Sequence, residues 1–271
     1  EACDDQVVEL SGTYEQRVAQ IQAMDLEEGF NFEHQPLVRL RIGDLGGGKS
    51  ALLISKHHLI LDGWSLPILM RELAHLYDSD VRGLPEKLGR PFAWQEHLQW
   101  LARQDQQAAR EYWKNHLSEL TEPSRLQLSP PAVAQTGTGA LYFTFDQSLN
   151  DQFEQFARLH GLTQASVLMG LYALVLAKTS RLSDLVIGSV HNGRANSVNG
   201  IDQAIGLFID TLPLHIALPA GQALVDWLAQ QQTAQAEQDV HSHIGLAAIQ
   251  TLAGFPGTSI FEALFVFENF P

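Results

Sequence analysis

The chain has 271 residues, of which 45% are hydrophobic and 18% are charged, and this balance is typical of a folded protein. Its 17 basic and 31 acidic side chains give a net charge of -14, with an isoelectric point near 5.1. An acidic surface repels phosphate backbones and anionic lipid headgroups, so we expect neither nucleic acid nor a membrane as a partner.

The ends of the sequence predict no targeting segment. Residues 1–8 lack the basic-then-apolar pattern of a signal peptide, and no apolar run approaches the roughly 18 residues that a membrane span needs. The single cysteine, Cys3, has no partner for an internal disulfide. We therefore expect a soluble cytoplasmic protein in which Cys3 is an incidental thiol. Because the sequence opens in a polar, helix-like stretch and stops after an apolar run, we also expect a domain truncated at both ends.

Periodicity in the first half predicts a helix, a β-hairpin and further helices. The predicted elements are a helix at 14–24, a strand at 36–42, a glycine turn at 46–48, a strand at 51–55, a loop at 57–63, a helix at 66–77, a loop at 83–92 and a long helix or helix pair at 94–120. A stretch rich in proline and glycine follows at 121–139. Such composition favours a boundary between lobes, which we place at 129–139.

The second half again alternates strands and helices. It predicts a strand at 140–145, helices at 147–160 and 163–181, a strand at 185–190, a glycine-bearing loop at 191–200, an apolar run at 205–209 leading into 211–214, a helix at 222–240 and a strand at 261–267. This alternation favours an α/β layered fold.

The clearest candidate for chemistry is the string His57-His58-Leu59-Ile60-Leu61-Asp62-Gly63-Trp64-Ser65. Neighbouring side chains of an extended chain point to opposite faces, so one histidine can face a cavity while the other packs inward. Asp62 can hold the loop by ion pairing or orient a ring. Gly63 permits a tight turn, and Ser65 suits the cap of the following helix.

A neutral imidazole accepts a proton near physiological pH, so this pair suits acid–base catalysis. The residues alone leave two alternatives open. The histidines can simply be satisfied at a strand end, or they can bind a metal ion. His-x-x-x-Asp without further clustered ligands is a poor zinc signature, so we predict no metal site.

The string from His57 to Ser65 resembles the HHxxxDG motif of condensation domains from nonribosomal peptide synthetases. Four further blocks resemble that family in the same order, at 100–117, 193–194, 205–214 and 265–271. Departures also occur, since Asp210 stands where the family usually has asparagine and His215 where it usually has a cation. The segment 94–97 replaces a more usual tyrosine and aspartate pattern, and the family's earliest motifs are absent.

The resemblance implies a two-lobed, chloramphenicol-acetyltransferase-like layered α/β fold, present here in part. Residues 1–128 would be the C-terminal part of the N-terminal lobe, 129–139 the linker, and 140–271 most of the C-terminal lobe. It also implies an acyltransferase of secondary metabolite biosynthesis that catalyses peptide bond formation. Donor and acceptor would be held as thioesters on the phosphopantetheine arms of upstream and downstream peptidyl carrier proteins. The domain itself would bind no cofactor, and its other partners would be neighbouring synthetase domains.

The resemblance implies a catalytic set of His58, His57, Asp62 and Gly63. His58 would take the amine proton and Gly63 would stabilise the oxyanion. Asp62 would pair with an arginine that we expect in a preceding segment. The candidates for lining a substrate tunnel are Trp64, Ser65, Arg194 and Asp210. For three of these an alternative stays open: Trp64 can pack the loop, Asp210 can cap a strand, and Arg194 can pair with a carboxylate across the lobes.

Two rival functions share the fold. The first is an epimerisation domain or another acyltransferase with a similar histidine loop, and the second is a non-catalytic condensation-like domain that recruits partner proteins. Trp64-Ser65 and Glu268-Asn269 favour condensation over the first rival. The intact histidine motif favours catalysis over the second. Ser65 is not expected to be a nucleophile, because no Gly-x-Ser-x-Gly elbow surrounds it.

Overall fold

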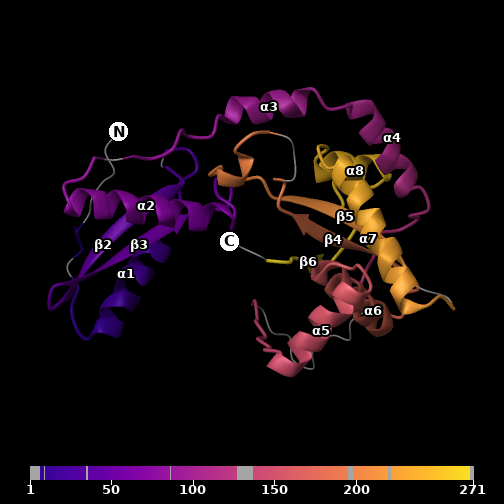
Figure 1. Ribbon diagram of the computed structural model, residues 1–271, viewed down its shortest axis with the longest axis horizontal. Coiled ribbons are helices and arrows are strands. Elements are labelled where there is room, and N and C mark those ends of the chain that lie inside the picture. Colours follow the sequence, from indigo (N-terminus) through magenta and orange to yellow (C-terminus); the bar gives the residue numbers. More distant parts are fainter. Residues whose placement is uncertain are drawn as a thin grey trace. The chain divides into compact units, whose positions relative to one another are not determined.

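The computed structural model describes residues 7–8, 10–34, 36–85, 87–126, 137–194, 198–218 and 221–268 (Figure 1). Three features noted in the sequence lie outside the described residues: Cys3, the greater part of the predicted linker at 129–139, and residues 269–271. The described chain forms two compact units. The first comprises residues up to 92 together with 199–208, and the second comprises 93–198 and 209–269.

The chain passes from the first unit to the second after residue 92 and returns to the first unit for residues 199–208. The sequence, in contrast, places the lobe boundary at 129–139. That boundary remains a prediction, since residues 127–136 are not described. The segment 199–208 belongs to the first unit although the chain on both sides of it belongs to the second.

The first unit contains the predicted hairpin. Its elements are β1 (Val7–Val8), α1 (Tyr14–Glu28), β2 (Val38–Gly46), β3 (Lys49–Lys56), α2 (Ser65–Val81) and the short 3-10 helix η1 (Ile201–Gln203). The sheet has the order β1-β2-β3, in which β1 is parallel and β3 antiparallel to β2. Helix α1 packs against β2 and β3 (Figure 1), so the helix, hairpin and second helix predicted for this region are confirmed.

A network of ion pairs attaches α1 to the hairpin. Asp25 Oδ1 accepts hydrogen bonds from Arg39 Nε at 2.7 Å and from Arg41 Nε at 3.0 Å, and its Oδ2 accepts one from Ser55. Glu28 pairs with both arginines. Burial would raise the pKa of Asp25, but the hydrogen bonds from Arg39, Ser55 and Arg41 outweigh it and lower this pKa to about 2.

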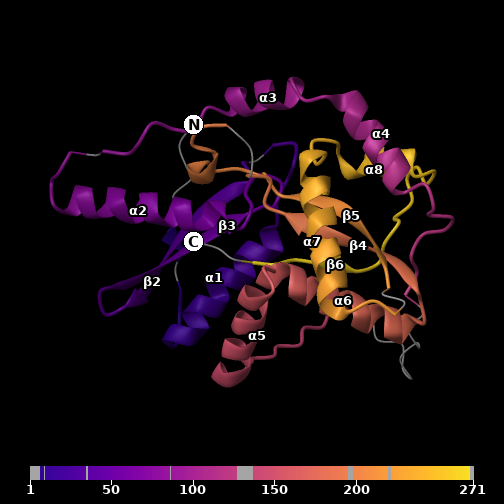
Figure 2. The same ribbon diagram turned by 45° about the vertical axis from the view of Figure 1, so that its right-hand side comes forward.

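The second unit is an α/β structure. Its elements are α3 (Trp94–Ala102), α4 (Gln106–His116), α5 (Gln147–Leu159), α6 (Gln164–Ser180), β4 (Asp184–His191), β5 (Asp210–Ala217), α7 (Leu224–Val240), α8 (Leu246–Leu252) and β6 (Leu264–Phe265). The sheet has the order β5-β4-β6, in which β5 is antiparallel and β6 parallel to β4. Figure 2 shows α7 and α6 beside this sheet.

Helices supply two cores around this sheet, which confirms the predicted layering of helices on strands. One core joins α5, α6 and α7 to the strands through residues such as Met169, Ile187, Leu214 and Trp227. The other joins α4 and α8 to the strands through residues such as Trp113, Val186, Leu212 and Ile249. Gly170 allows α6 to approach α7 closely, since a Cβ there would lie 2.3 Å from Leu228 Cδ2.

Two expectations for the second unit need correction. Residues 140–145 do not form the predicted strand, because no described strand pairs with them; Leu141, Tyr142 and Phe143 are 85%, 91% and 84% exposed. The strand expected at 261–267 is limited to Leu264–Phe265. Helix α8 was not predicted.

The stretch 94–120 is a helix pair, which was one of the two predicted alternatives. Asp105 caps α4 by accepting from the amides of Gln107 and Ala108.

Within the described residues, no single helix is long and apolar enough to cross a membrane. Helices α5 and α6 reach that length and composition only when taken together, with a bend of 106° between them.

Candidate functional site

The candidate site is the loop 57–63, which connects β3 to α2 in the first unit. The His57 amide donates to the carbonyl of Leu37 at 2.8 Å, and the His57 carbonyl accepts from the amide of Ile60 at 3.2 Å. The first bond holds the loop beside the start of the hairpin. The second closes a turn that contains His58.

The two adjacent histidines have different surroundings. The His57 ring is partly buried and lies edge-on to Phe32 and Phe30, with centroid distances of 4.8 Å and 6.1 Å. Its Nδ1 accepts from the amide of Leu59 at 3.1 Å. His58 is exposed and, among the described residues, makes no hydrogen bond or ion pair. One imidazole is therefore held by the protein and the other is available to a ligand.

Asp62 joins the loop to a segment far away in the sequence. Its Oδ1 accepts from the amide of Ser65 at 2.8 Å, and its Oδ2 accepts from the amide of Phe208 at 3.0 Å. The Asp62 amide donates to the carbonyl of Gly206 at 3.1 Å. Both Asp62 and Ser65 are fully buried, so this carboxylate is a structural tie between two parts of the first unit.

Ser65 completes this tie. Its Oγ lies 2.8 Å from both Asp62 Oδ1 and the carbonyl of Gly206, and it accepts from the amide of Gly206 at 2.9 Å. The expectation that Ser65 caps α2 is wrong. Ser65 is the first helical residue, and the carboxylate of Asp62 accepts its amide hydrogen. We call Asp62, Ser65, Gly206 and Phe208 the loop clamp.

The other two residues of the motif flank the clamp. The carbonyl of Gly63 accepts from the amide of Leu66 at 3.3 Å, and no acceptor for the Gly63 amide occurs among the described residues. Trp64 is partly exposed and directly precedes α2, without capping it by its side chain.

Arg194 and Asp210 lie in the second unit, near one end of the β4–β5 pair. Arg194 follows β4 and is 8% exposed. Asp210 opens β5, opposite His191 at the end of β4. Burial raises the pKa of Asp210 to about 6, although a hydrogen bond from the Thr211 backbone and the charge of His191 act in the other direction. His191 Nδ1 lies 2.6 Å from Asp239 Oδ1.

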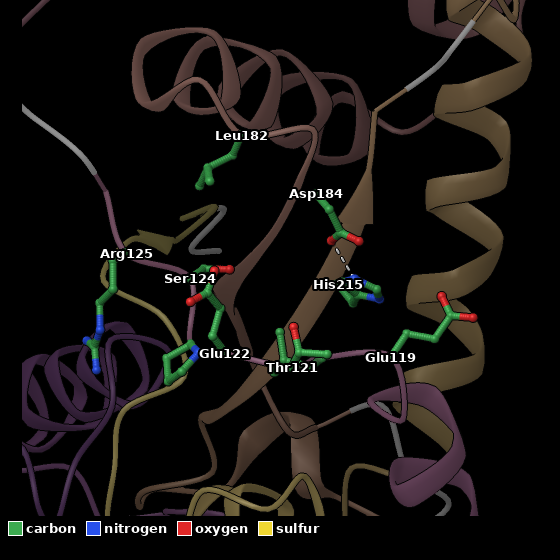
Figure 3. A pocket seen from close by; sticks show the side chains of 10 residues that line it. Glu119, Thr121, Glu122, Ser124, Arg125, Leu182, Asp184 and His215 are labelled. Atoms are coloured by element: carbon green, nitrogen blue, oxygen red, sulfur yellow. Dashed lines mark hydrogen bonds and ion pairs between the residues drawn. The ribbon is translucent and has the colours of Figure 1, made fainter.

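A cavity of about 380 Å³ lies at the other end of β4, beside its first residue, Asp184 (Figure 3). His215 of β5 lies in its wall and is paired with Asp184 at 2.5 Å. Burial and the charge of His215 lower the pKa of the neighbouring His116 to about 4. None of the predicted site residues lines this cavity.

The described residues contain no group of three or more His, Cys, Asp or Glu side chains that could hold a metal ion.

Four residues of the site were not predicted to take part in it. Gly206 and Phe208 fall in a block that was recognised by resemblance, but no spacing rule connects residues separated by 141 positions. Phe30 and Phe32 precede the hairpin in a polar stretch, and only their recurrence as aromatic residues two positions apart could have drawn attention to them.

The fold and the histidine loop define a class of protein. The chain belongs to the condensation domain family, whose model, "Condensation domain", matches residues 3–271.

Relatives of the chain include large bacterial synthases. It is 30% identical over 252 residues to bacitracin synthase 1 of Bacillus licheniformis, covering 91% of this chain and 5% of that protein. It is 29% identical over 245 residues to surfactin synthase subunit 2 of Bacillus subtilis (strain 168), covering 90% and 7%. The chain thus spans a small part of each relative.

Solved structures have the same fold. The X-domain from teicoplanin biosynthesis matches with a TM-score of 0.77 and 20% identity, over 96% of this chain and 60% of that one. The first condensation domain of the calcium-dependent antibiotic synthetase, in complex with a substrate analogue, matches with a TM-score of 0.71 and 20% identity, over 97% and 61%. The expected condensation-domain fold, of the chloramphenicol acetyltransferase type, is confirmed.

Proposed function

We propose that the chain is an amide-forming condensation domain of a nonribosomal peptide synthetase. It joins a donor acyl thioester to an acceptor aminoacyl thioester, each held by a carrier protein. The observation that carries this proposal is the division of roles within the histidine motif. His58 is exposed, whereas His57, Asp62 and Ser65 are held by hydrogen bonds. An exposed imidazole on a fixed loop is suited to meet a substrate.

The reaction follows from the chemistry of the two substrates. A free α-amino group has a pKa of about 8, so a useful fraction is neutral near pH 7.5. The amine nitrogen attacks the thioester carbonyl, the carbon–nitrogen bond forms, and the carbon–sulfur bond breaks as the tetrahedral intermediate collapses. His58 accepts the nitrogen's proton and returns a proton to the departing thiolate. Such general-base catalysis typically contributes about 10²–10⁴-fold.

Positioning and electrostatics supply the rest of the rate enhancement. Holding amine and thioester together replaces a bimolecular encounter and can lower the barrier by about 7–11 kcal/mol. The amide of Gly63, which has no described acceptor, donates to the oxyanion of the intermediate. Trp64, Arg194 and Asp210 are the proposed tunnel-lining residues. The burial of Ser65 supports a place in the loop clamp instead.

The names of the relatives support the substrate class. Two of them are named as synthases, one of bacitracin and one of surfactin. The partners proposed here are therefore peptidyl carrier proteins with phosphopantetheine arms and adjoining synthetase domains. Membership of the condensation domain family supports our proposal of a cytoplasmic location.

The test uses the intact polypeptide that carries this chain and two carrier proteins loaded with donor and acceptor. Product on the acceptor carrier is followed by intact-protein mass spectrometry for the wild type, His58→Ala and His75→Ala. His75 is an exposed histidine of α2 and serves as the matched control. We expect dipeptide from the wild type and from His75→Ala, with a loss of about 10²–10⁴-fold in His58→Ala.

The other outcomes point to other functions. Equal product from His58→Ala would show that His58 is not the catalytic base. Inversion of a carrier-bound residue without amide formation would favour an epimerisation domain. No product from any loaded pair, together with binding of another protein, would favour recruitment, and one solved relative is indeed a complex of an X-domain with OxyB.

A further inference from the structure

His57 presents one ring nitrogen to the backbone of the loop that carries His58. The amide of Leu59 donates to His57 Nδ1 at 3.1 Å. A nitrogen accepts a hydrogen bond only when it carries no proton, so the neutral His57 ring has its proton on Nε2. An imidazolium carries protons on both nitrogens and cannot accept this bond. The turn around His58 therefore depends on the tautomer of its neighbour.

Two phenylalanines fix the plane of the His57 ring. The ring centroids of Phe32 and His57 are 4.8 Å apart with an interplanar angle of 78°, and those of Phe30 and His57 are 6.1 Å apart with an angle of 88°. Edge-to-face contacts of this kind are favourable and directional. We call Phe30 and Phe32 the aromatic wall.

The aromatic wall is itself attached to the α1–hairpin network. The Arg39 guanidinium carbon lies 5.0 Å from the centroid of the Phe30 ring, a cation–π contact. Arg39 is held in turn by Asp25 at 2.7 Å and by the carbonyl of Gly29 at 3.0 Å. A continuous series of contacts thus leads from partly buried ion pairs to the ring of His57 and from its Nδ1 to the His58 turn.

We propose that Phe30 and Phe32 are positioning residues that hold His57 as the Nε2-protonated neutral tautomer, and that His57, through the Leu59 amide, fixes the turn from which His58 projects. This proposal rests on the proposed function, because the position of His58 matters only if His58 meets the substrates. The geometric part of it can be tested without any substrate.

The first test is spectroscopic and uses the chain labelled with ¹⁵N-histidine at pH 7.5. Long-range ¹H–¹⁵N correlation spectra distinguish a bare ring nitrogen from a protonated one, and the signals of His57 are assigned by their loss in His57→Gln. We expect a bare Nδ1 and a protonated Nε2. Phe32→Leu should give a mixture of tautomers, whereas Tyr77→Leu should not. Phe32 and Tyr77 are both exposed aromatic residues of the first unit, at 59% and 72%, so they form a matched pair.

The second test separates the tautomer from general packing. Asparagine places a carbonyl oxygen where His57 has Nδ1, and glutamine places one where it has Nε2. We expect His57→Asn to retain most of the dipeptide-forming rate. His57→Gln should lose on the order of 10- to 100-fold in kcat with little change in KM, as expected for a misplaced catalytic group. Thermal melting of each variant identifies any that fails to fold.

Several results would overturn the proposal: a protonated Nδ1 in the wild type, an unchanged tautomer in Phe32→Leu, or equal rates for the Asn and Gln variants. If the wild type forms no dipeptide, the proposed function fails. The tautomer spectra then still decide whether the aromatic wall sets the His57 ring, so the two failures are distinguishable.

Discussion

At the scale of single residues, burial raises the pKa of the Asp210 carboxyl to about 6. The residues next to it in the sequence do not indicate this change. A raised carboxyl pKa means that the folded state favours the protonated form. The corresponding contribution to stability is fully present below about pH 4 and is lost as the pH rises through about 6. Near neutral pH, the ionised Asp210 carboxylate therefore destabilises the second unit.

Asp210→Asn should remove this effect, because asparagine has a similar shape and no charge. We expect the variant to be more stable than the wild type by about 2–3 kcal/mol at pH 7.5, with the difference falling to about 1 kcal/mol at pH 4.5. Urea denaturation at the two pH values measures this. Asp202→Asn is the control, because Asp202 is an exposed residue of η1. A difference that is the same at both pH values would contradict the assignment.

The pair His57 and His58 shows what sequence alone predicts about single residues. Alternation in an extended chain predicts that adjacent side chains face opposite ways. One ring is packed and the other is exposed, but the pair follows the end of β3 and His58 lies in a turn, so strand alternation is not the cause. Alternation does not say which one packs. That depends on Phe30 and Phe32, which precede the hairpin, and on the amide of Leu59.

At the scale of elements, Asp25 connects α1 to the β2–β3 hairpin. Its side chain is 14% exposed and that of Arg41 is 5% exposed, so removal of the carboxylate leaves two guanidinium groups poorly compensated. We expect Asp25→Asn to destabilise the first unit by about 3 kcal/mol. The effect should fade as the pH falls from about 4 through 2, where the carboxylate itself becomes protonated.

Chemical denaturation followed by hydrogen exchange in α1 and β2 measures this change. The matched control is Asp78→Asn, which breaks the ion pair with Arg82, whose partners are 55% and 65% exposed. An exposed pair of this kind contributes about 0–1 kcal/mol. Equal effects of the two substitutions would show that the Asp25 network is no more important than a surface ion pair.

Local signals predicted most of the elements, and the two misjudged ones, residues 140–145 and helix α8, have different causes. The alternation at 36–42 and the glycines at 46–48 are sufficient to specify a hairpin, because both strands and their turn are adjacent in the sequence. The segment 140–145 has similar alternation, but a strand also needs a paired neighbour, and none of the described strands supplies one. Helix α8 has only 7 residues, too few for a periodic pattern to be recognised.

At the scale of the whole chain, the loop clamp unites two recognised blocks of sequence. The motif at 57–65 was singled out from its residues, whereas the block at 205–214 was recognised only by resemblance. Their contact spans 141 to 146 positions, and no local pattern encodes it. The roles of Asp62 and Ser65 therefore became visible only in the folded chain, where segment 199–208 joins the first unit.

The clamp predicts a change in backbone dynamics at a distance in the sequence. Asp62→Asn replaces one acceptor oxygen by an NH₂ group, so the amide of Ser65 or of Phe208 loses its acceptor. We expect hydrogen exchange at 205–209 to accelerate by on the order of 10-fold, which corresponds to about 1.4 kcal/mol less protection. Exchange measured by mass spectrometry on peptides from this segment tests it.

The control is Asp146→Ala, which removes the cap of α5, where Asp146 accepts from the amide of Leu149 at 2.8 Å. That substitution should accelerate exchange only in the first turn of α5, since its hydrogen bond is local. Faster exchange at 205–209 in Asp62→Asn but not in Asp146→Ala would assign the effect to the clamp. If Asp62→Asn leaves 205–209 unchanged, the carboxylate does not hold this segment in solution. The fixed loop on which the proposed role of His58 depends would then need another anchor.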